Sequence, residues 1–102
     1  MTQEATQLKV TGPAVDAELR PRQAPDLDVT ETDDGYIIYE PEKDKVHHLN
    51  PSAVLILELC DGVNTATEIA EAVREVLQLA SAPIGDVADG ISALAAEGLV
   101  SW

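Results

Sequence analysis

The spacing of apolar and polar positions changes along the chain and divides it into three parts. The first 25 residues hold three of the six prolines and no sustained apolar period, which is typical of a flexible arm. Within it, Val15 and Leu19 have the spacing of one helical turn. From residue 26 apolar residues alternate with polar ones, and after residue 50 they follow a helical period. The pattern therefore predicts an arm over 1–25 and one folded domain over 26–102.

Three short strands are predicted before residue 50. Leu27–Thr30 alternates, Tyr36–Tyr39 is β-branched and aromatic, and Lys45–Leu49 forms a third candidate strand. Asp33-Asp34-Gly35 is typical of a hairpin turn, and residues 41–44 turn the chain a second time. The sequence thus predicts an antiparallel meander, which needs helices to cover one of its faces.

Residues 46–62 join the last strand to the first helix without a loop. Asn50 is a favourable N-cap and Pro51 occupies the first helical position, where its missing N–H costs nothing. Asp61-Gly62 ends the helix, because glycine readily adopts the left-handed conformation. A helix that starts so abruptly fixes the angle between sheet and helix, and we expect a groove at this junction.

Two further helices are predicted, over Thr65–Leu79 and Pro83–Glu97. The first opens with a capping box, Thr65 to Glu68, and the second stops at Gly98 before an apolar tail. The expected inward-facing residues are Ile69, Val73, Val76, Leu77, Ile84, Val87, Ile91, Leu94 and Ala95. The predicted fold class is α+β, winged helix-turn-helix-like, with a three-stranded antiparallel sheet followed by three helices.

The net charge of −13 excludes several function classes. Six lysines and arginines against nineteen acids cannot neutralise phosphates, so nucleic acid and anionic membranes are not expected partners. A winged-helix DNA-binding protein has the same element order, but residues 83–97 hold no lysine or arginine to read a base. The chain has no apolar run of 18 residues and no signal peptide, so we expect a cytoplasmic protein.

Catalytic and metal-binding motifs are absent from the sequence. His47 and His48 are adjacent, so on a strand they point to opposite faces and cannot chelate one metal. Cys60, the single cysteine, lies in an apolar helix and is expected to be a buried thiol. An acyl carrier protein would need an acid before the helix-start serine, but Ser52 follows Pro51. We therefore expect a protein that binds without catalysis, cofactor or metal.

Five segments of the chain together resemble the PqqD-like proteins, the small peptide chaperones of pyrroloquinoline quinone biosynthesis. They are Leu49-Asn50-Pro51-Ser52-Ala53, Ile56 to Gly62, Thr65-x-x-Glu68-Ile69, Asp86-Val87, and Leu94 to Val100. The resemblance covers residues 20–102. It implies a non-catalytic domain that holds the leader region of a precursor peptide as an added strand. It also implies delivery to a modifying enzyme, such as a radical S-adenosylmethionine protein.

The same resemblance implies a binding site on the third strand and the third helix. The implied peptide-binding residues are Lys45, Val46, His47, His48, Leu49, Val87, Gly90, Ile91 and Leu94. The helical residues among them have the spacing of a core-facing stripe as well, and Lys45 and His47 also suit the protection of an exposed strand edge. Two alternatives stay open: a structural or regulatory subunit that docks on a partner without a peptide, and a homodimer paired through the strand edge.

Overall fold

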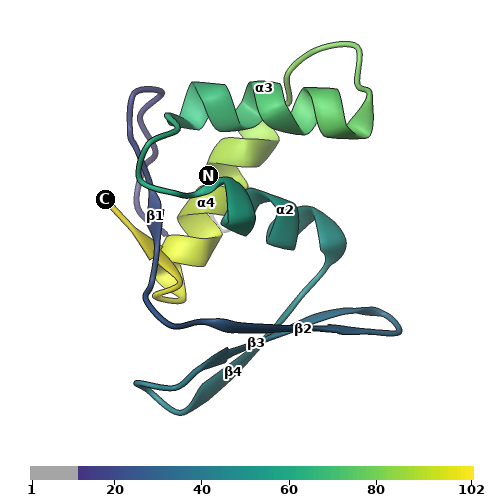
Figure 1. Cartoon of the computed structure of the whole chain (residues 1–102). Helices are drawn as coiled ribbons and strands as arrows, with labels where there is room; N and C mark the ends of the chain where they lie inside the picture. Colours follow the sequence, from purple (N-terminus) through teal and green to yellow (C-terminus); the bar gives the residue numbers. More distant parts are fainter. Residues whose placement is uncertain (1–11) are drawn as a thin grey trace, which may run out of the picture.

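The computed structural model describes residues 12–102, which form a three-stranded sheet, three helices and a two-stranded sheet (Figure 1). The elements are β1 (Arg22–Gln23), β2 (Asp28–Thr32), β3 (Gly35–Glu40), β4 (Lys45–Leu49), α2 (Pro51–Leu59), α3 (Ala66–Leu77), α4 (Ile84–Ala96) and β5 (Val100–Ser101). This order confirms the predicted three strands followed by three helices.

The three-stranded sheet is an antiparallel meander in the order β2-β3-β4. Its register places Ile38 of the central strand between Val29 of β2 and His47 of β4. Ile38 is fully buried against the helices, because alternate residues of β3 point toward them. Both β2 and β4 are edge strands of this sheet.

Helix α2 starts directly after β4, as the sequence predicts. The Asn50 side chain accepts a hydrogen bond from the Ala53 N–H at 2.8 Å, and Pro51 stands at the first helical position. The helix contacts β3 and β4 on one side and α3 and α4 on the other. It is therefore the central element of the fold.

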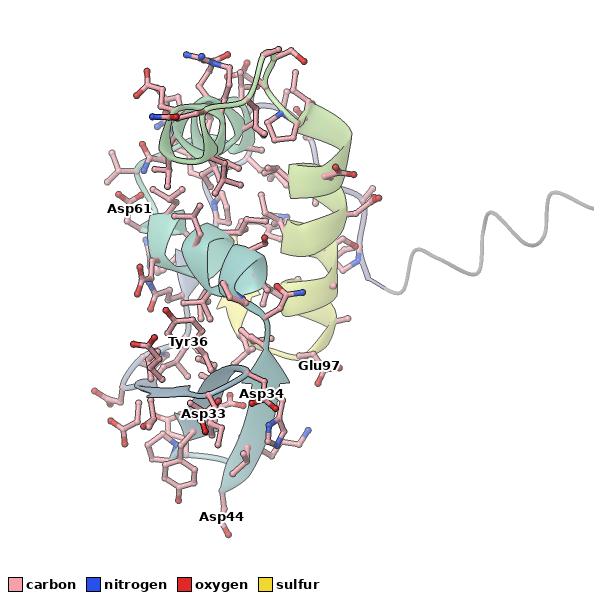
Figure 2. All side chains as sticks on the ribbon, turned by 90° about the vertical axis from the view of Figure 1, so that its right-hand side faces the viewer. Asp33, Asp34, Tyr36, Asp44, Asp61 and Glu97 are labelled. Atoms are coloured by element: carbon pink, nitrogen blue, oxygen red, sulfur yellow. The ribbon has the colours of Figure 1, made fainter. Side chains whose placement is uncertain are left out.

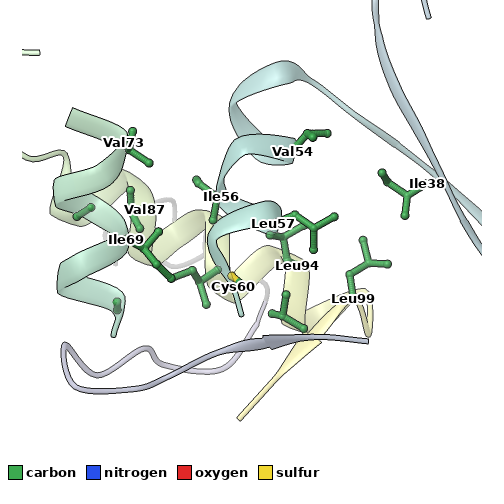
Figure 3. Close-up of a cluster of buried hydrophobic side chains, with 14 residues drawn as sticks. Ile38, Val54, Ile56, Leu57, Cys60, Ile69, Val73, Val87, Leu94 and Leu99 are labelled. Carbon is green, nitrogen blue, oxygen red and sulfur yellow. The ribbon is translucent and has the colours of Figure 1, made fainter. Parts of the chain in front are cut away.

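The core is one cluster that all three helices and the sheet share (Figure 3). Its members are Ile38, Val54, Ile56, Leu57, Cys60, Ala66, Ile69, Ala70, Val73, Val87, Ile91, Leu94, Leu99 and Val100. Burial among these side chains raises the pKa of the Cys60 thiol to about 12. The thiol is thus protonated and unreactive at neutral pH.

The junction between α3 and α4 departs from the predicted stripe. The capping box of Thr65 and Glu68 is present at the start of α3. Val76, Leu77 and Ile84, however, are exposed, so the prediction that they face inward is wrong. They flank the loop that joins the two helices (Figure 1), where no other helix or strand of residues 12–102 covers them.

Residues 12–25 are attached to the helices by hydrogen bonds from end to end. The Ser92 hydroxyl donates to the Pro13 carbonyl at 2.7 Å, and the Ala66 N–H donates to the Leu19 carbonyl at 2.9 Å. Strand β1 then pairs with β5. The described part of the predicted flexible arm is therefore packed on the domain, whereas residues 1–11 lie outside the described residues.

We expect that Leu57→Ala lowers the free energy of unfolding by about 2–5 kcal/mol, because it leaves a cavity where α2 meets the sheet. The matched control is Val63→Ala on the exposed α2–α3 loop, for which we expect a change within about 0.5 kcal/mol. Urea unfolding monitored by circular dichroism measures both values. Equal losses would contradict the placement of the core.

Candidate functional site

The outer edge of β4 is the first feature of the candidate site. Within residues 12–102, β4 pairs with β3 alone, so its other edge presents unpaired N–H and C=O groups at alternate residues. The strand has five residues and is about 16 Å long. This edge is a template for one further strand.

A pocket of about 400 Å³ lies beside this edge, lined by Val46, His47, His48, Leu49 and Glu97. Glu97 comes from the C-terminal end of α4 and lies next to β4 in Figure 2. The structure therefore brings four of the five predicted strand residues together with the end of the third helix. Lys45, the fifth, is exposed at the start of β4.

His47 connects the sheet to α4 through two carboxylates. Its ring is buried, with Nε2 at 3.1 Å from Oε1 of Glu40 and Nδ1 at 3.5 Å from Oε1 of Glu97. The contact with Glu40 is a hydrogen bond, whereas Glu97 is a longer contact from a carboxylate that is largely exposed. This chain of three side chains spans the groove between β4 and α4.

Glu40 is the buried end of that chain. The hydrogen bond from His47 lowers the pKa of the Glu40 carboxyl, and Lys43, 3.4 Å away, lowers it further against the opposing effect of burial. Neither Glu40 nor Glu97 was among the residues predicted for the site. For Glu40 the sequence did hold one signal of burial. Residues 36, 38 and 40 alternate along the predicted strand, so Glu40 shares the inward face with Tyr36 and Ile38.

The apolar residues predicted on α4 lie mostly in the core, and Val87 also lines a pocket between the helices. Val87, Ile91 and Leu94 are only 1%, 0% and 3% exposed and belong to the core. In this structure they support the wall of the groove from behind, since the stripe that they form faces α2 and α3. Gly90 lines a pocket, and an added Cβ there would lie 2.8 Å from Cδ1 of Ile56. The glycine thus permits close packing of α4 on α2.

A second, mostly apolar pocket of about 310 Å³ opens between the starts of α2 and α4 and the end of α3. Its lining residues are Asn50, Ser52, Ala53, Ile56, Val73, Leu77, Leu79, Pro83, Asp86, Val87 and Gly90. Because Asn50 directly follows β4, this pocket begins where the strand edge ends. The sequence does not reveal it, because residues from three helices and a loop must come together to form it.

The described part of the chain holds no group of three or more His, Cys, Asp or Glu side chains suited to a metal ion. Among residues 12–102, no helix has both the length and the apolar character needed to cross a bilayer.

These elements define an α+β domain of the winged helix-turn-helix type whose sheet ends in the edge strands β2 and β4, of which β4 lies beside the end of α4. The family model described as Coenzyme PQQ synthesis protein D (PqqD) matches residues 35–100, more than half of the chain. The chain therefore belongs to the PqqD family. A comparison with curated proteins found no match.

Two solved structures share the fold. One is the solution NMR structure of the PqqD truncation of Methylobacterium extorquens PqqCD, described as a functional and stand-alone RiPP recognition element. It is 23% identical, with a TM-score of 0.69, and the match covers 87% of this chain and 96% of that one. The other is lasso peptide synthetase B1 complexed with the leader peptide, 21% identical, with a TM-score of 0.59 and coverage of 81% and 99%.

We expect the stability of the protein to fall as the pH drops through the lowered pKa of Glu40. A carboxyl whose pKa is lower in the folded state stabilises that state above the unfolded pKa, near 4.5, and ceases to do so once it is protonated. Glu40→Gln should therefore flatten the pH dependence of the free energy of unfolding between about pH 5 and 3. Urea titrations over this range measure it.

The exposed neighbour Glu42 provides the control for this experiment. Glu42→Gln should leave the pH dependence as in the unmodified chain. If Glu40→Gln and Glu42→Gln behave alike, the pairing of Glu40 with His47 does not stabilise the fold.

Proposed function

We propose that this chain is a non-catalytic binding module that captures the leader region of a ribosomally made precursor peptide and presents it to a modifying enzyme. The observation that carries the proposal is the open edge of β4 beside the end of α4, in a chain of the PqqD family. Of the two structural neighbours, the PqqD truncation is a RiPP recognition element, and the lasso peptide synthetase is complexed with a leader peptide.

In the proposed mode, the peptide extends the sheet as a strand along Lys45–Leu49. Only alternate residues of β4 direct their backbone groups outward, so the added strand forms a few main-chain hydrogen bonds. Each contributes about 0.5–1.5 kcal/mol net, whereas micromolar affinity requires about 8 kcal/mol. The main-chain bonds therefore set the register, and side-chain burial must supply most of the affinity.

The two pockets along the groove are the proposed sites of that burial. Alternate side chains of an added strand point toward the helices, where the pocket at Glu97 receives one of them. A peptide that continues past Leu49 reaches Asn50 and the apolar pocket behind it. Glu97 and Asp86 lie at these pockets, so a leader with basic residues suits the groove.

The proposed site differs from the set implied by the sequence in how its members act. Lys45 to Leu49 supply the strand edge, and Gly90 lets α4 approach α2. Val87, Ile91 and Leu94 fix the position of α4 from within the core. The partner that receives the peptide is a peptide-modifying enzyme, for which a radical S-adenosylmethionine protein is the proposed example. The proposed compartment is the cytoplasm, in which ribosomes produce such peptides.

A docking subunit that needs no peptide is the second candidate function. It is favoured by the exposed apolar residues around the α3–α4 loop, Val76, Leu77, Leu79 and Ile84. Such a subunit would bind the enzyme equally well with and without a leader peptide.

A homodimer joined through β4 would instead lose its dimeric state when the leader binds, which sedimentation can measure.

We expect this chain to bind a synthetic peptide with micromolar or better affinity, when the peptide has the sequence of a leader region encoded near the gene of this chain. In heteronuclear NMR spectra of the full chain, amide signals of residues 45–49 and 84–97 should shift together, because both sides of the groove meet the ligand. Shifts confined to residues 1–20, or no binding, would contradict the proposal.

We expect the affinity of the leader for this chain to alternate when its backbone amides are N-methylated one at a time. In an added strand every second N–H donates to β4, so methylation there should weaken binding about tenfold while intervening positions change little. Calorimetric titration measures each peptide, and the unmethylated leader is the control. A flat profile across the segment would rule out strand addition.

A further inference from the structure

A separate pocket of about 400 Å³ lies where the two-stranded sheet meets the α2–α3 loop. It is lined by Arg20, Arg22, Gly62, Ser101 and Trp102. We propose that this arginine pocket binds a carboxylate side chain of a partner polypeptide. The argument depends on the pocket alone and does not use the proposed peptide groove.

The first reason is the distribution of positive charge. In a chain with a net charge of −13, Lys43 pairs with Glu40, and Arg74 pairs with Glu71 and Glu75. Within residues 12–102, neither Arg20 nor Arg22 forms an ion pair, and no residue that lines their pocket is acidic. Among the described residues, two guanidinium groups thus line one pocket and neither forms an ion pair, although Asp61 is the bridge partner of Arg22 on the adjacent backbone.

The backbone beneath Arg22 is built to hold its side chain. Gly62 has a φ of +81°, and its N–H donates to the Pro21 carbonyl at 2.8 Å. A Cβ at position 62 would lie 3.0 Å from Nε of Arg22, so the absence of a side chain leaves room for the guanidinium. The glycine therefore allows the positive φ of the turn and also leaves space for the Arg22 side chain in the pocket.

Nearby polar groups leave the guanidinium groups available to a ligand. The carboxylate of Asp61, the nearest acid, accepts hydrogen bonds from the N–H groups of Asn64 and Val63 at 2.8 and 2.9 Å, which lower its pKa, and it forms no ion pair with either arginine. Arg20 donates one N–H to the Val63 carbonyl. An arginine carries five N–H donors, so most remain free for a planar carboxylate.

Trp102 forms the apolar wall of the pocket. Its side chain is 47% exposed, and it also lines a neighbouring cavity of about 300 Å³ together with Pro13, Ala95, Val100 and Ser101. Arginine and tryptophan are the residue types that contribute most often to protein–protein binding. The ligand that fits is an aspartate or glutamate with an apolar neighbour in the partner's sequence.

The arginine pocket is distinct from the groove at β4. None of its residues belongs to β4 or α4. In Figure 1, β1 and the C-terminal end lie along the left of the helices, and the three-stranded sheet lies below them. A peptide on β4 and an acidic segment in the arginine pocket can therefore be bound at once.

Trp102 is the only tryptophan of the chain, so its fluorescence reports on this pocket directly. The probe is the peptide acetyl-Leu-Glu-Glu-Leu-amide, with acetyl-Leu-Gln-Gln-Leu-amide and inorganic phosphate as comparisons. We expect a saturable change with the glutamate peptide alone. Arg22→Gln should weaken this binding about tenfold, and Arg22→Lys by less, because lysine keeps the charge but loses the planar fork.

Arg74→Gln is the matched control, because it removes an arginine of α3 far from the pocket in sequence and should leave the affinity unchanged. Circular dichroism and thermal unfolding check that each variant is folded, and leader binding at β4 should be unaffected by Arg22→Gln. The proposal is overturned by no saturable change, by an equal response to the glutamine peptide or phosphate, or by equal losses in Arg22→Gln and Arg74→Gln.

Discussion

The structure depends on one covalent constraint, the direct passage from β4 into α2 at Asn50-Pro51. Because no loop separates the two elements, the side-chain cap at Asn50 fixes the direction of α2 relative to the sheet. Helix α2 then contacts β3, β4, α3 and α4, so its direction determines where α4 packs. The groove between β4 and α4 is a consequence of this junction.

The buried ring of His47 contacts one carboxylate of β3 and one at the end of α4. Ile38 and its neighbours form a dry core, whereas Glu40, His47 and Glu97 form a polar chain along its margin. Loss of Glu40 would leave a buried ring nitrogen of His47 without its hydrogen bond, which is costly. The side chains of β4 are thus tied to α4, while the backbone of its outer edge stays unpaired and able to accept a strand.

Local signals in the sequence predicted the parts of this fold that depend on few residues. The caps at Asn50 and Thr65 and the helical periods reproduce the observed helices closely. Contacts between distant residues could not be read in this way: Pro13 meets Ser92 across 79 positions, and two-residue strands such as β1 show no alternation. Periodicity also cannot distinguish a groove-facing stripe from a core-facing one, so only the family resemblance placed Val87, Ile91 and Leu94 at the site, and all three are buried in the core.

The proposed peptide binding has two requirements, attraction and alignment, which different groups of the domain would meet. Asp34 and Asp44 lie on the turns of the sheet in Figure 2, and Glu97 lines the pocket beside β4, in a chain with a net charge of −13. An excess of acids creates a negative potential that acts over about a Debye length of 8 Å in physiological salt. Such a potential accelerates the encounter with a basic peptide, but it does not determine which residues of the peptide pair with β4. Register comes from the alternating backbone groups of β4, which act only at contact distance. Attraction and alignment therefore arise from different atoms, so a substitution of a surface acid can change the rate of binding without changing which residues of the peptide pair with the strand.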